Sequence, residues 1–447
     1  MVGLITIFCA VIAIVGWIKL KNPFNPFTAM LALWAVWVPL SDMGLFGMTH
    51  PSEKIYKIIL CGLIAYVVGC LMGILCRRVH FRNNPCRSAT ALRVNYTLLY
   101  ILCFIAIAFY SLQSVQVIRL LISGHDMAYI RDLVFSKDEN ELRSSGLIVN
   151  LNYFVVTPTT YFMMAYLPAE LFKEKKDKIL IAESLIMLGL WLLTTGGRTI
   201  LLFMAISVAC VFLNEQGKKD KLSATWKLLI TRKKTSKFKS YFAIIAGGAA
   251  VLIVIFGITF ARKGADVDLL RQFYVYYGAP IRLFDYYVNI IDREHSDLYG
   301  YGLSSFYGFA YPVMFVLRQL HIIGSYPEHM LTIHNWSISK LQDSVYLGGR
   351  IHINAFVTQF FQPYLDGRFV GVAIVLAVFG FFCSVFYFKW VTYKSIRYQT
   401  AYLLMLHKIV FSMGRFWFTQ PGQALSLILV FVAISYCTLN NREKNKN

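Results

Sequence analysis

The sequence is poor in charged side chains, and acidic ones are the scarcest. Charged residues make up 15% of the 447 residues, whereas a water-soluble chain has about a quarter. Lysine and arginine together number 44 against 23 acidic residues, and 57% of the chain is hydrophobic. This composition excludes an ordinary soluble globular protein and favours a chain that a lipid bilayer surrounds.

The sequence also lacks segments in which apolar and polar residues alternate, as they do in β-strands. Its apolar residues gather instead in unbroken runs of about twenty, the length that a helix needs to cross a bilayer. Backbone groups inside lipid must be hydrogen-bonded within their own segment, so we expect these runs to be helices. The prediction is an all-α polytopic integral membrane protein, a single membrane-embedded domain over residues 1–447 with about eleven transmembrane helices. The predicted spans are 2–18, 28–45, 55–76, 96–118, 147–167, 179–195, 198–214, 241–260, 369–388, 399–414 and 423–438.

The net charge of +21 would suit a nucleic-acid-binding protein, but its distribution does not. The basic residues concentrate in alternate loops between the apolar runs, as in the run from Lys218 to Lys239. This is the positive-inside pattern of membrane proteins. It predicts an N-terminus outside, a C-terminus in the cytoplasm, the bilayer as a partner and no nucleic acid.

Cysteine is missing from the predicted outer segments. All nine cysteines fall in predicted spans or cytoplasmic loops, so we expect no disulfide framework. Their spacing is not that of a zinc site. We therefore expect neither a metal nor a cofactor.

One predicted outer segment, residues 261–368, is far longer than a connector needs to be. It is rich in tyrosine and phenylalanine, which favour the membrane interface. We expect interfacial helices in this large extracytoplasmic loop, and Ser304–Ile323 would lie flat on the bilayer or dip into it. The alternative is an additional pair of spans in this region.

Basic residues gather at the outer edge of the predicted membrane, against the positive-inside bias. Arg262 and Arg271 follow the eighth predicted span, and Arg282 shares a helix face with Asp285. Pairing with nearby carboxylates is one explanation. A diphosphate site is the other, because the arginine fork suits phosphate oxygens.

Arg198 stands in the stretch Thr194–Thr199, between two predicted spans with almost no loop. Two glycines before it let the backbone turn tightly and approach a ligand. The arginine would be held at the outer membrane boundary, either towards a ligand or simply snorkelling at a helix end.

Lys408 and Arg415 are seven residues apart and therefore share one face of the tenth predicted span. An ionisable group at that depth is expensive and marks a functional site by default. His352 is the natural general base near neutral pH, although a lone loop histidine is more often structural. Further polar residues near this level are Tyr277, Arg350, Asn354 and Asp366.

These residues and the topology resemble the Wzy-type oligosaccharide repeat-unit polymerases of bacterial O-antigen, capsule and exopolysaccharide assembly. The resemblance rests on the Gly-Gly-Arg turn at Gly196–Thr199, a Tyr-Gly turn in Tyr276–Pro280, and a late segment with Asn354–Thr358, Tyr364–Gly367 and Gly371. The chain departs from some members in one respect. No arginine of its outer loops is followed eleven positions later by glycine.

The resemblance implies a metal-independent glycosyltransferase of the cell envelope. The donor would be a growing glycan on undecaprenyl diphosphate, and the acceptor a single repeat unit on the same carrier. A hydroxyl group of the acceptor would attack the anomeric carbon and release the diphosphate. The reaction would take place at the outer face of the bacterial cytoplasmic membrane, with a chain-length regulator and a flippase as further partners.

The same resemblance gives the basic residues their expected roles. Arg198 and Arg282 would stabilise the departing diphosphate, and His352 would accept the proton, with His321 and His334 as weaker bases. The residues expected to bind the diphosphate or the substrate are Arg262, Arg271, Tyr277, Asp285, Arg350, Asn354, Asp366, Lys408 and Arg415.

Two other functions compete with the polymerase. A ligase would transfer the finished glycan to a different acceptor by the same chemistry. A polysaccharide flippase or transporter would move it without extending it. Transporters usually have internal repeats and polar sites at the bilayer midplane, and the sequence suggests neither.

Overall fold

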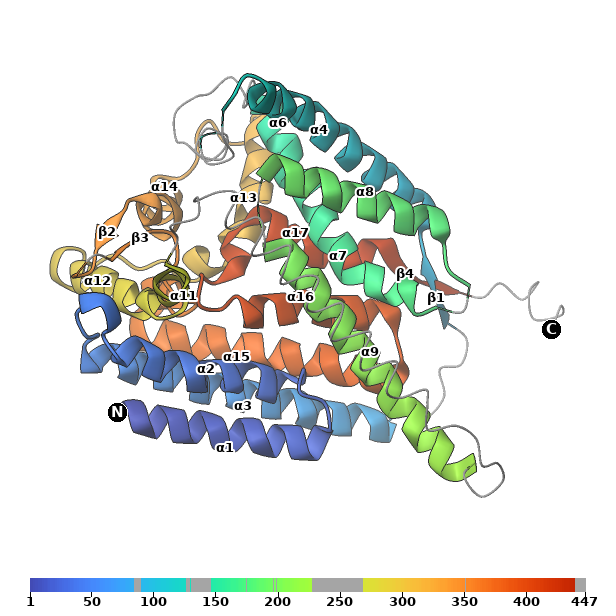
Figure 1. The fold of residues 1–447 in the computed structure, drawn as a ribbon, viewed down its shortest axis with the longest axis horizontal. Helices are drawn as coiled ribbons and strands as arrows, with labels where there is room; N and C mark the ends of the chain where they lie inside the picture. The colour runs from blue at the N-terminus through green and yellow to red at the C-terminus, as the bar shows by residue number, and fades with distance from the viewer. Residues whose placement is uncertain are drawn as a thin grey trace. The chain divides into compact units, whose positions relative to one another are not determined.

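The computed structural model describes residues 1–83, 90–125, 129, 146–173, 175–195, 197, 199–226, 268–349 and 351–438. The chain forms two compact units, the first from residues 1–93 with 268–447 and the second from residues 94–267. Both are built mainly from helices (Figure 1), as the continuous apolar runs predict.

Four long helices of the first unit lie side by side: α1 (Val2–Leu20), α2 (Pro26–Asp42), α3 (Glu53–Asn83) and α15 (Phe361–Tyr393) (Figure 1). The start of α2 is fixed locally. The side chain of Asn25 accepts a 2.9 Å hydrogen bond from the Thr28 backbone N–H, and proline occupies the first helical position.

Helices α3 and α15 approach each other closely because glycine faces backbone on both sides. A Cβ atom added at Gly69 would lie 1.9 Å from the carbonyl oxygen of Ala377. One added at Gly380 would lie 2.2 Å from the carbonyl oxygen of Tyr66. Small residues at a helix contact are typical of membrane proteins, where close packing replaces the hydrophobic effect.

The rest of the first unit consists of shorter elements. Its helices are α11 (Leu269–Tyr277), α12 (Ala279–Glu294), α13 (Leu303–Gln319), α14 (Glu328–His334), α16 (Ile396–Val410) and α17 (Pro421–Ala433). Its single turns are η1 (Leu45–Gly47), η4 (Asn335–Ser339), η5 (Lys340–Gln342) and η6 (Trp417–Thr419). Strand β2 (Val345–Tyr346) pairs antiparallel with β3 (His352–Ile353), and β1 (Thr90–Val94) pairs with β4 (Ile434–Thr438).

The second unit contains α4 (Tyr96–Ile122), α6 (Gly146–Leu151), the π-helical turn η3 (Asn152–Val156), α7 (Thr157–Leu171), α8 (Lys178–Thr195) and α9 (Thr199–Trp226). Helix α7 contacts α4, α8 and α9, and α4 packs along α8.

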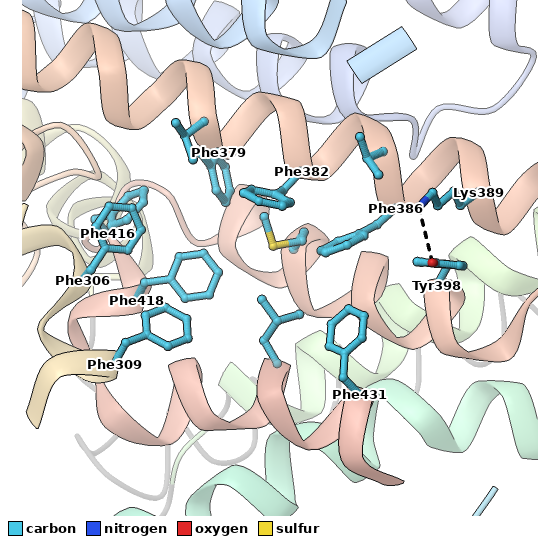
Figure 2. A pocket seen from close by; sticks show the side chains of 14 residues that line it. Phe306, Phe309, Phe379, Phe382, Phe386, Lys389, Tyr398, Phe416, Phe418 and Phe431 are labelled. Atoms are coloured by element: carbon cyan, nitrogen blue, oxygen red, sulfur yellow. Dashed lines mark hydrogen bonds between the residues drawn. The ribbon is translucent and has the colours of Figure 1, made fainter. Parts of the chain in front are cut away.

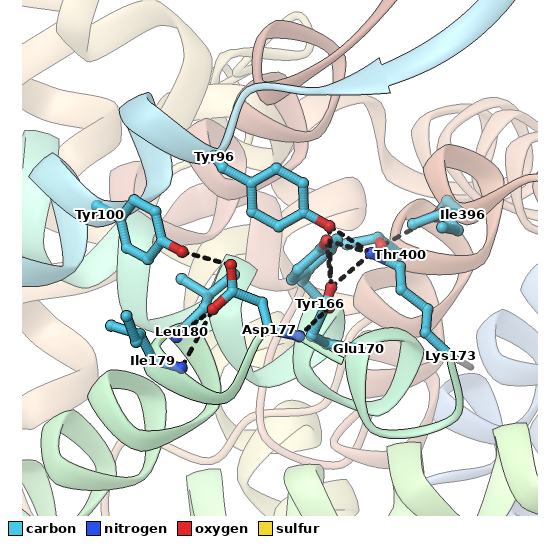
Figure 3. Close-up of polar contacts among 10 residues, drawn as sticks. All are labelled: Tyr96, Tyr100, Tyr166, Glu170, Lys173, Asp177, Ile179, Leu180, Ile396 and Thr400. Atoms are coloured by element: carbon cyan, nitrogen blue, oxygen red, sulfur yellow. Dashed lines mark hydrogen bonds and ion pairs between the residues drawn. The ribbon is translucent and has the colours of Figure 1, made fainter. Parts of the chain in front are cut away.

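A polar cluster joins α4 to the end of α7 and the start of α8 (Figure 3). Glu170 is buried and forms an ion pair with Lys173, whose ammonium also donates to the hydroxyls of Tyr96 (2.8 Å) and Tyr166 (2.9 Å). Asp177 accepts the backbone N–H of Leu180 at 3.0 Å and so caps α8. These bonds satisfy the buried carboxylate and fix the turn between the helices.

Five described helices are long and apolar enough to cross a bilayer: α1, residues Glu53–Cys76 of α3, α4, α8 and α15. Thr199–Asn214 and α17 are apolar but shorter. The chain is therefore a helical, multi-pass membrane protein. The number of about eleven spans stays a prediction, and the predicted span 241–260 lies outside the described residues.

The outward faces of these helices suit lipid. On α1, the side chains of Leu4, Ile7 and Val11 are more than half exposed. Contiguous apolar surface of this kind would aggregate in water. In a bilayer it faces hydrocarbon, which accepts it without penalty.

Several predicted spans are corrected at their ends. The predicted span 399–414 is wrong beyond Val410, where α16 ends, so Lys408 and Arg415 do not share a helix face as expected. The predicted span 28–45 is wrong beyond Asp42, where α2 ends. The predicted span 423–438 is wrong beyond Ala433, because α17 ends there and Ile434–Thr438 is strand β4, whose residues include the strand formers isoleucine, tyrosine and threonine. The predicted span 369–388 starts directly after the break in α15 at Gly367 and Arg368, but it ends too early, since α15 continues to Tyr393, where Lys394 adopts a left-handed conformation.

Candidate functional site

Two non-helical segments meet inside the first unit, residues 354–360 and 411–416. The backbone N–H groups of Val357 and Gln359 donate to the carbonyl oxygens of Gly414 (2.8 Å) and Ser412 (2.7 Å). Irregular backbone at membrane depth persists only where protein buries it or where it lines a cavity. These segments bring buried polar side chains to one place, which a continuous helix would not do.

Lys408 lies beside these segments and is 2% exposed. Its ammonium donates to the side-chain oxygen of Gln423 at 3.2 Å and to the carbonyl oxygen of Leu404 at 3.3 Å. The Nζ atom also lies 4.7 Å from the ring centroid of Phe418. All of these partners are neutral.

Arg415 is 7% exposed and its charge is likewise met by neutral groups. Its Nη2 donates to the carbonyl oxygen of Ala355 at 3.1 Å, while its buried Nε has no hydrogen-bond partner among the described residues. Within the same residues, no carboxylate forms an ion pair with Lys408 or Arg415. Burying a cation costs several kcal/mol unless an opposite charge compensates it. Lys408 and Arg415, here called the cationic centre, are therefore two buried groups, each of which an anion would complement.

Figure 2 shows an apolar cavity of about 450 Å³, a volume in the usual range for small-molecule pockets. It lies beside Lys408. Phe418 lines the cavity and also carries Lys408 over its ring. At the opposite end, Lys389 donates to the hydroxyl of Tyr398 (Figure 2). The remaining lining residues are apolar: Phe306, Phe309, Val378, Phe379, Phe382, Val385, Phe386, Met405, Phe416, Leu427 and Phe431.

The cavity keeps its shape because α13 approaches η6 closely. A Cβ atom added at Gly308 would lie 2.5 Å from the carbonyl oxygens of both Phe418 and Gln420. The absence of a side chain there brings Phe306 and Phe309 against Phe416 and Phe418. An apolar cavity beside buried cations can hold an amphiphile, with the hydrocarbon in the cavity and the anionic group at the cations.

Asp366, which is expected to bind substrate, lies at the start of helix α13. Its carboxylate accepts the backbone N–H groups of Ser304 and Ser305, both at 2.8 Å. Helix α15 breaks directly after it, at Gly367 and Arg368. Asp366 therefore caps α13 from another part of the chain and fixes the helix that lines the cavity.

Asp285 and Arg282, expected at a diphosphate site, are bonded to each other. Asp285 accepts from Arg282 Nη1 (3.1 Å), from the hydroxyl of Ser52 (2.6 Å) and from the Ser52 backbone N–H (3.1 Å). Arg282 Nε donates to the hydroxyl of Thr49 at 2.8 Å. The pair thus holds the start of α3 to α12, as the carboxylate-pairing explanation predicts.

The other expected residues are spread over the first unit. His352 is exposed on β3 with its ring 5.2 Å from that of Tyr346, and the Asn354 amide donates to the carbonyl oxygen of Gln342. Tyr277 stacks on Trp37, and Arg271 is half-buried on α11. Arg198, Arg262 and Arg350 lie outside the described residues.

Of the weaker bases, His334 is half-buried on α14, beside the ring of Tyr307, and burial lowers its pKa. His321 is exposed after α13, in a left-handed conformation. Among the described residues, no group of three or more histidine, cysteine or acidic side chains is placed to hold a metal ion.

Sequence reasoning missed the aromatic cavity and Gln423. One signal was available, because Phe379, Phe382 and Phe386 repeat at the spacing of one helix face. In a membrane protein, however, the same spacing also describes a face towards lipid. Only the tertiary structure shows that α13 and α17 cover that face.

The fold and this site define a helical multi-pass membrane protein with a buried cationic centre beside a hydrocarbon-lined cavity. Comparison with protein families, with characterised proteins and with solved structures finds no match to the chain.

Proposed function

We propose that this protein is a glycosyltransferase that polymerises oligosaccharide repeat units carried on undecaprenyl diphosphate, at the outer face of the bacterial cytoplasmic membrane. The observation that supports the proposal is the pair of buried cations, Lys408 and Arg415, beside the apolar cavity. A polyprenyl diphosphate combines the two properties that this site complements, a diphosphate anion and a hydrocarbon chain.

In the proposed reaction, an acceptor hydroxyl oxygen forms a bond to the anomeric carbon of the donor glycan. The bond from that carbon to the diphosphate oxygen breaks, and its electron pair leaves with the diphosphate. Lys408 and Arg415 stabilise this growing negative charge, because they are held in place before the reaction begins and a bound diphosphate favours their charged forms. His352, exposed on β3, accepts the hydroxyl proton near neutral pH.

The geometry favours Lys408 and Arg415 over Arg282 as the diphosphate ligands. Arg282 already has a carboxylate, that of Asp285, within 3.1 Å. A cation that is paired in this way has less to gain from a second anion, whereas an uncompensated buried cation gains the full interaction. For Arg198 the proposed role stays the same, which is to stabilise the departing diphosphate at the outer membrane boundary.

The proposal is tested with purified protein in nanodiscs, supplied with lipid-linked repeat units of its own organism. The wild-type protein is expected to produce a ladder of lengthened glycans. The variant Lys408→Met keeps the side-chain length but removes the charge, and we expect it to lose about two orders of magnitude in rate or more, as for other transition-state charge stabilisers. Lys340→Met is the control, because Lys340 lies over Trp336 and outside the cavity.

Each other outcome has a defined meaning. Transport of repeat units without lengthening would make the protein a transporter. Transfer of finished glycan to a different acceptor would make it a ligase. A full ladder from Lys408→Met would remove the cationic centre from the mechanism.

A further inference from the structure

Tyr301, in the turn between α12 and α13, has an unusual combination of exposure and backbone conformation. Its side chain is 82% exposed. Its backbone φ of 50° is left-handed, a region that residues other than glycine rarely adopt. Such strain persists only where the surrounding structure enforces it, and it is concentrated at functional sites.

The surroundings of Tyr301 do enforce it. The backbone N–H of Tyr301 donates to the carbonyl oxygen of Asp366 at 3.1 Å, and that of Gly300 donates to the carbonyl oxygen of Leu365 at 2.9 Å. A Cβ atom added at Gly300 would lie 2.3 Å from the Asp366 carboxylate. The turn is therefore built onto the beginning of α15, and the tyrosine ring is presented to solvent from a fixed support.

The ring of Tyr301 is also the outer end of a stack of planar groups. It stacks with Tyr299 at a centroid distance of 6.0 Å, and the Arg368 guanidinium lies 4.9 Å from the Tyr299 centroid and 5.4 Å from that of Tyr364. Tyr364 is buried and donates to the carboxylate of Asp292. The stack thus reaches from the core of the first unit to its surface.

The exposed ring of Tyr301 has one polar neighbour in contact with it. His329 lies 6.1 Å from Tyr301, centroid to centroid, and is exposed. Asp297 and Glu328, close in sequence to Tyr299 and His329, are exposed as well.

An exposed aromatic face with a polar neighbour matches the chemistry of a saccharide ring. Such a ring has C–H groups on its faces, which pack on an aromatic plane, and hydroxyls on its edge, which need hydrogen-bond partners. We propose that Tyr301, with Tyr299 and His329, is a saccharide-stacking site that holds a sugar ring of a glycan substrate. This inference rests on the proposed function for the source of the glycan.

The test is direct binding of the protein in nanodiscs to an array of oligosaccharides built from hexoses, hexosamines, deoxyhexoses and uronic acids. We expect wild-type protein to bind a subset of the array and Tyr301→Ala to bind that subset about tenfold more weakly, the loss of one good aromatic contact. Tyr301→Trp should bind as the wild type does. Tyr286→Ala removes another exposed ring, on α12, and should leave binding unchanged.

Binding that is absent in the wild type, or equal in Tyr301→Ala, would overturn the saccharide site. So would quenching of the added Tyr301→Trp emission by lipids with brominated acyl chains, because the ring would then lie in hydrocarbon. The two proposals fail separately. A glycan ladder with no effect of Tyr301→Ala removes only the stacking site, whereas array binding without any ladder removes only the polymerase.

Discussion

Asp366 and Ser304 are 62 residues apart in sequence and are joined by a 2.8 Å hydrogen bond from the Ser304 backbone N–H to the Asp366 carboxylate. The first N–H groups of a helix have no partner within it, and a carboxylate there also complements the helix dipole. This bond ties the break in α15 to the start of α13. It therefore fixes the cavity and the turn that carries Tyr301.

We expect Asp366→Ala to lower the free energy of unfolding by about 1–3 kcal/mol, because it leaves two buried N–H groups unsatisfied. Thermal unfolding in detergent measures the change. Asp268→Ala is the comparison, since Asp268 caps α11 in the same way through the Arg271 backbone N–H but at the surface. Equal losses in the two variants would contradict a special role for the buried cap.

Lys408→Met should leave the protein as stable as the wild type or make it more stable. Among the described residues, Lys408 is buried with neutral partners only, and replacing a buried charge with an apolar side chain of similar size removes its desolvation cost. Thermal unfolding would show an unchanged or raised midpoint, in the same preparation that loses glycan synthesis. A lowered midpoint together with full synthesis would make Lys408 a structural residue.

Gly308→Ala should destabilise the first unit by about 1–3 kcal/mol, the usual cost of overpacking. The added methyl group would meet two backbone oxygens at 2.5 Å, and backbone cannot rotate away as a side chain can. Gly324→Ala is the control, because a Cβ atom added there meets nothing within 4 Å. If both substitutions are equally mild, α13 does not depend on close contact with η6.

The second unit should lose stability in acid through Asp177. The hydrogen bond from Tyr100 holds the pKa of the Asp177 carboxyl below its usual 3.8, helped by the backbone N–H groups at the start of α8. A lowered folded-state pKa contributes stability that is present above pH 3.8 and is lost as the pH falls through the folded-state pKa.

The measurement is the difference in unfolding midpoint between the wild type and Tyr100→Phe as the pH falls from neutral. We expect a clear difference near pH 7 that shrinks below the usual aspartate pKa of about 4. Tyr393→Phe, at the exposed end of α15, should show no such change. A constant difference across the range would mean that the Tyr100 hydroxyl does not act through the ionised carboxylate.

Several features follow from the sequence because their causes are local. The helices α1, α4 and α8 coincide with apolar runs long enough to cross a bilayer, and lipid leaves such a run no alternative to a helix. Asn25 before Pro26 marks the start of α2 by its cap. The place of Lys408 within an apolar helix can also be read locally, since an apolar run that contains a cation is rare.

The roles of the polar residues could not be read in the same way. Asp366 and Asp285, which are expected to bind substrate, are each bonded to the start of a helix that is distant in sequence. A carboxylate that serves a helix and one that serves a ligand are the same residue type. Only the position of the partner distinguishes them.

By itself, the sequence determined that this is a helical membrane protein, which residues its apolar helices contain, and that cations lie among them, because each of these depends on residues close together in the chain. The tertiary structure decided which of the described cations lack a carboxylate partner, and where the phenylalanines of α13, α15 and α17 enclose a cavity. It also decided that a hydrogen bond to the backbone of Asp366 keeps Tyr301 in an exposed turn. Those outcomes depend on contacts between residues far apart in sequence, which are fixed only when the helices pack.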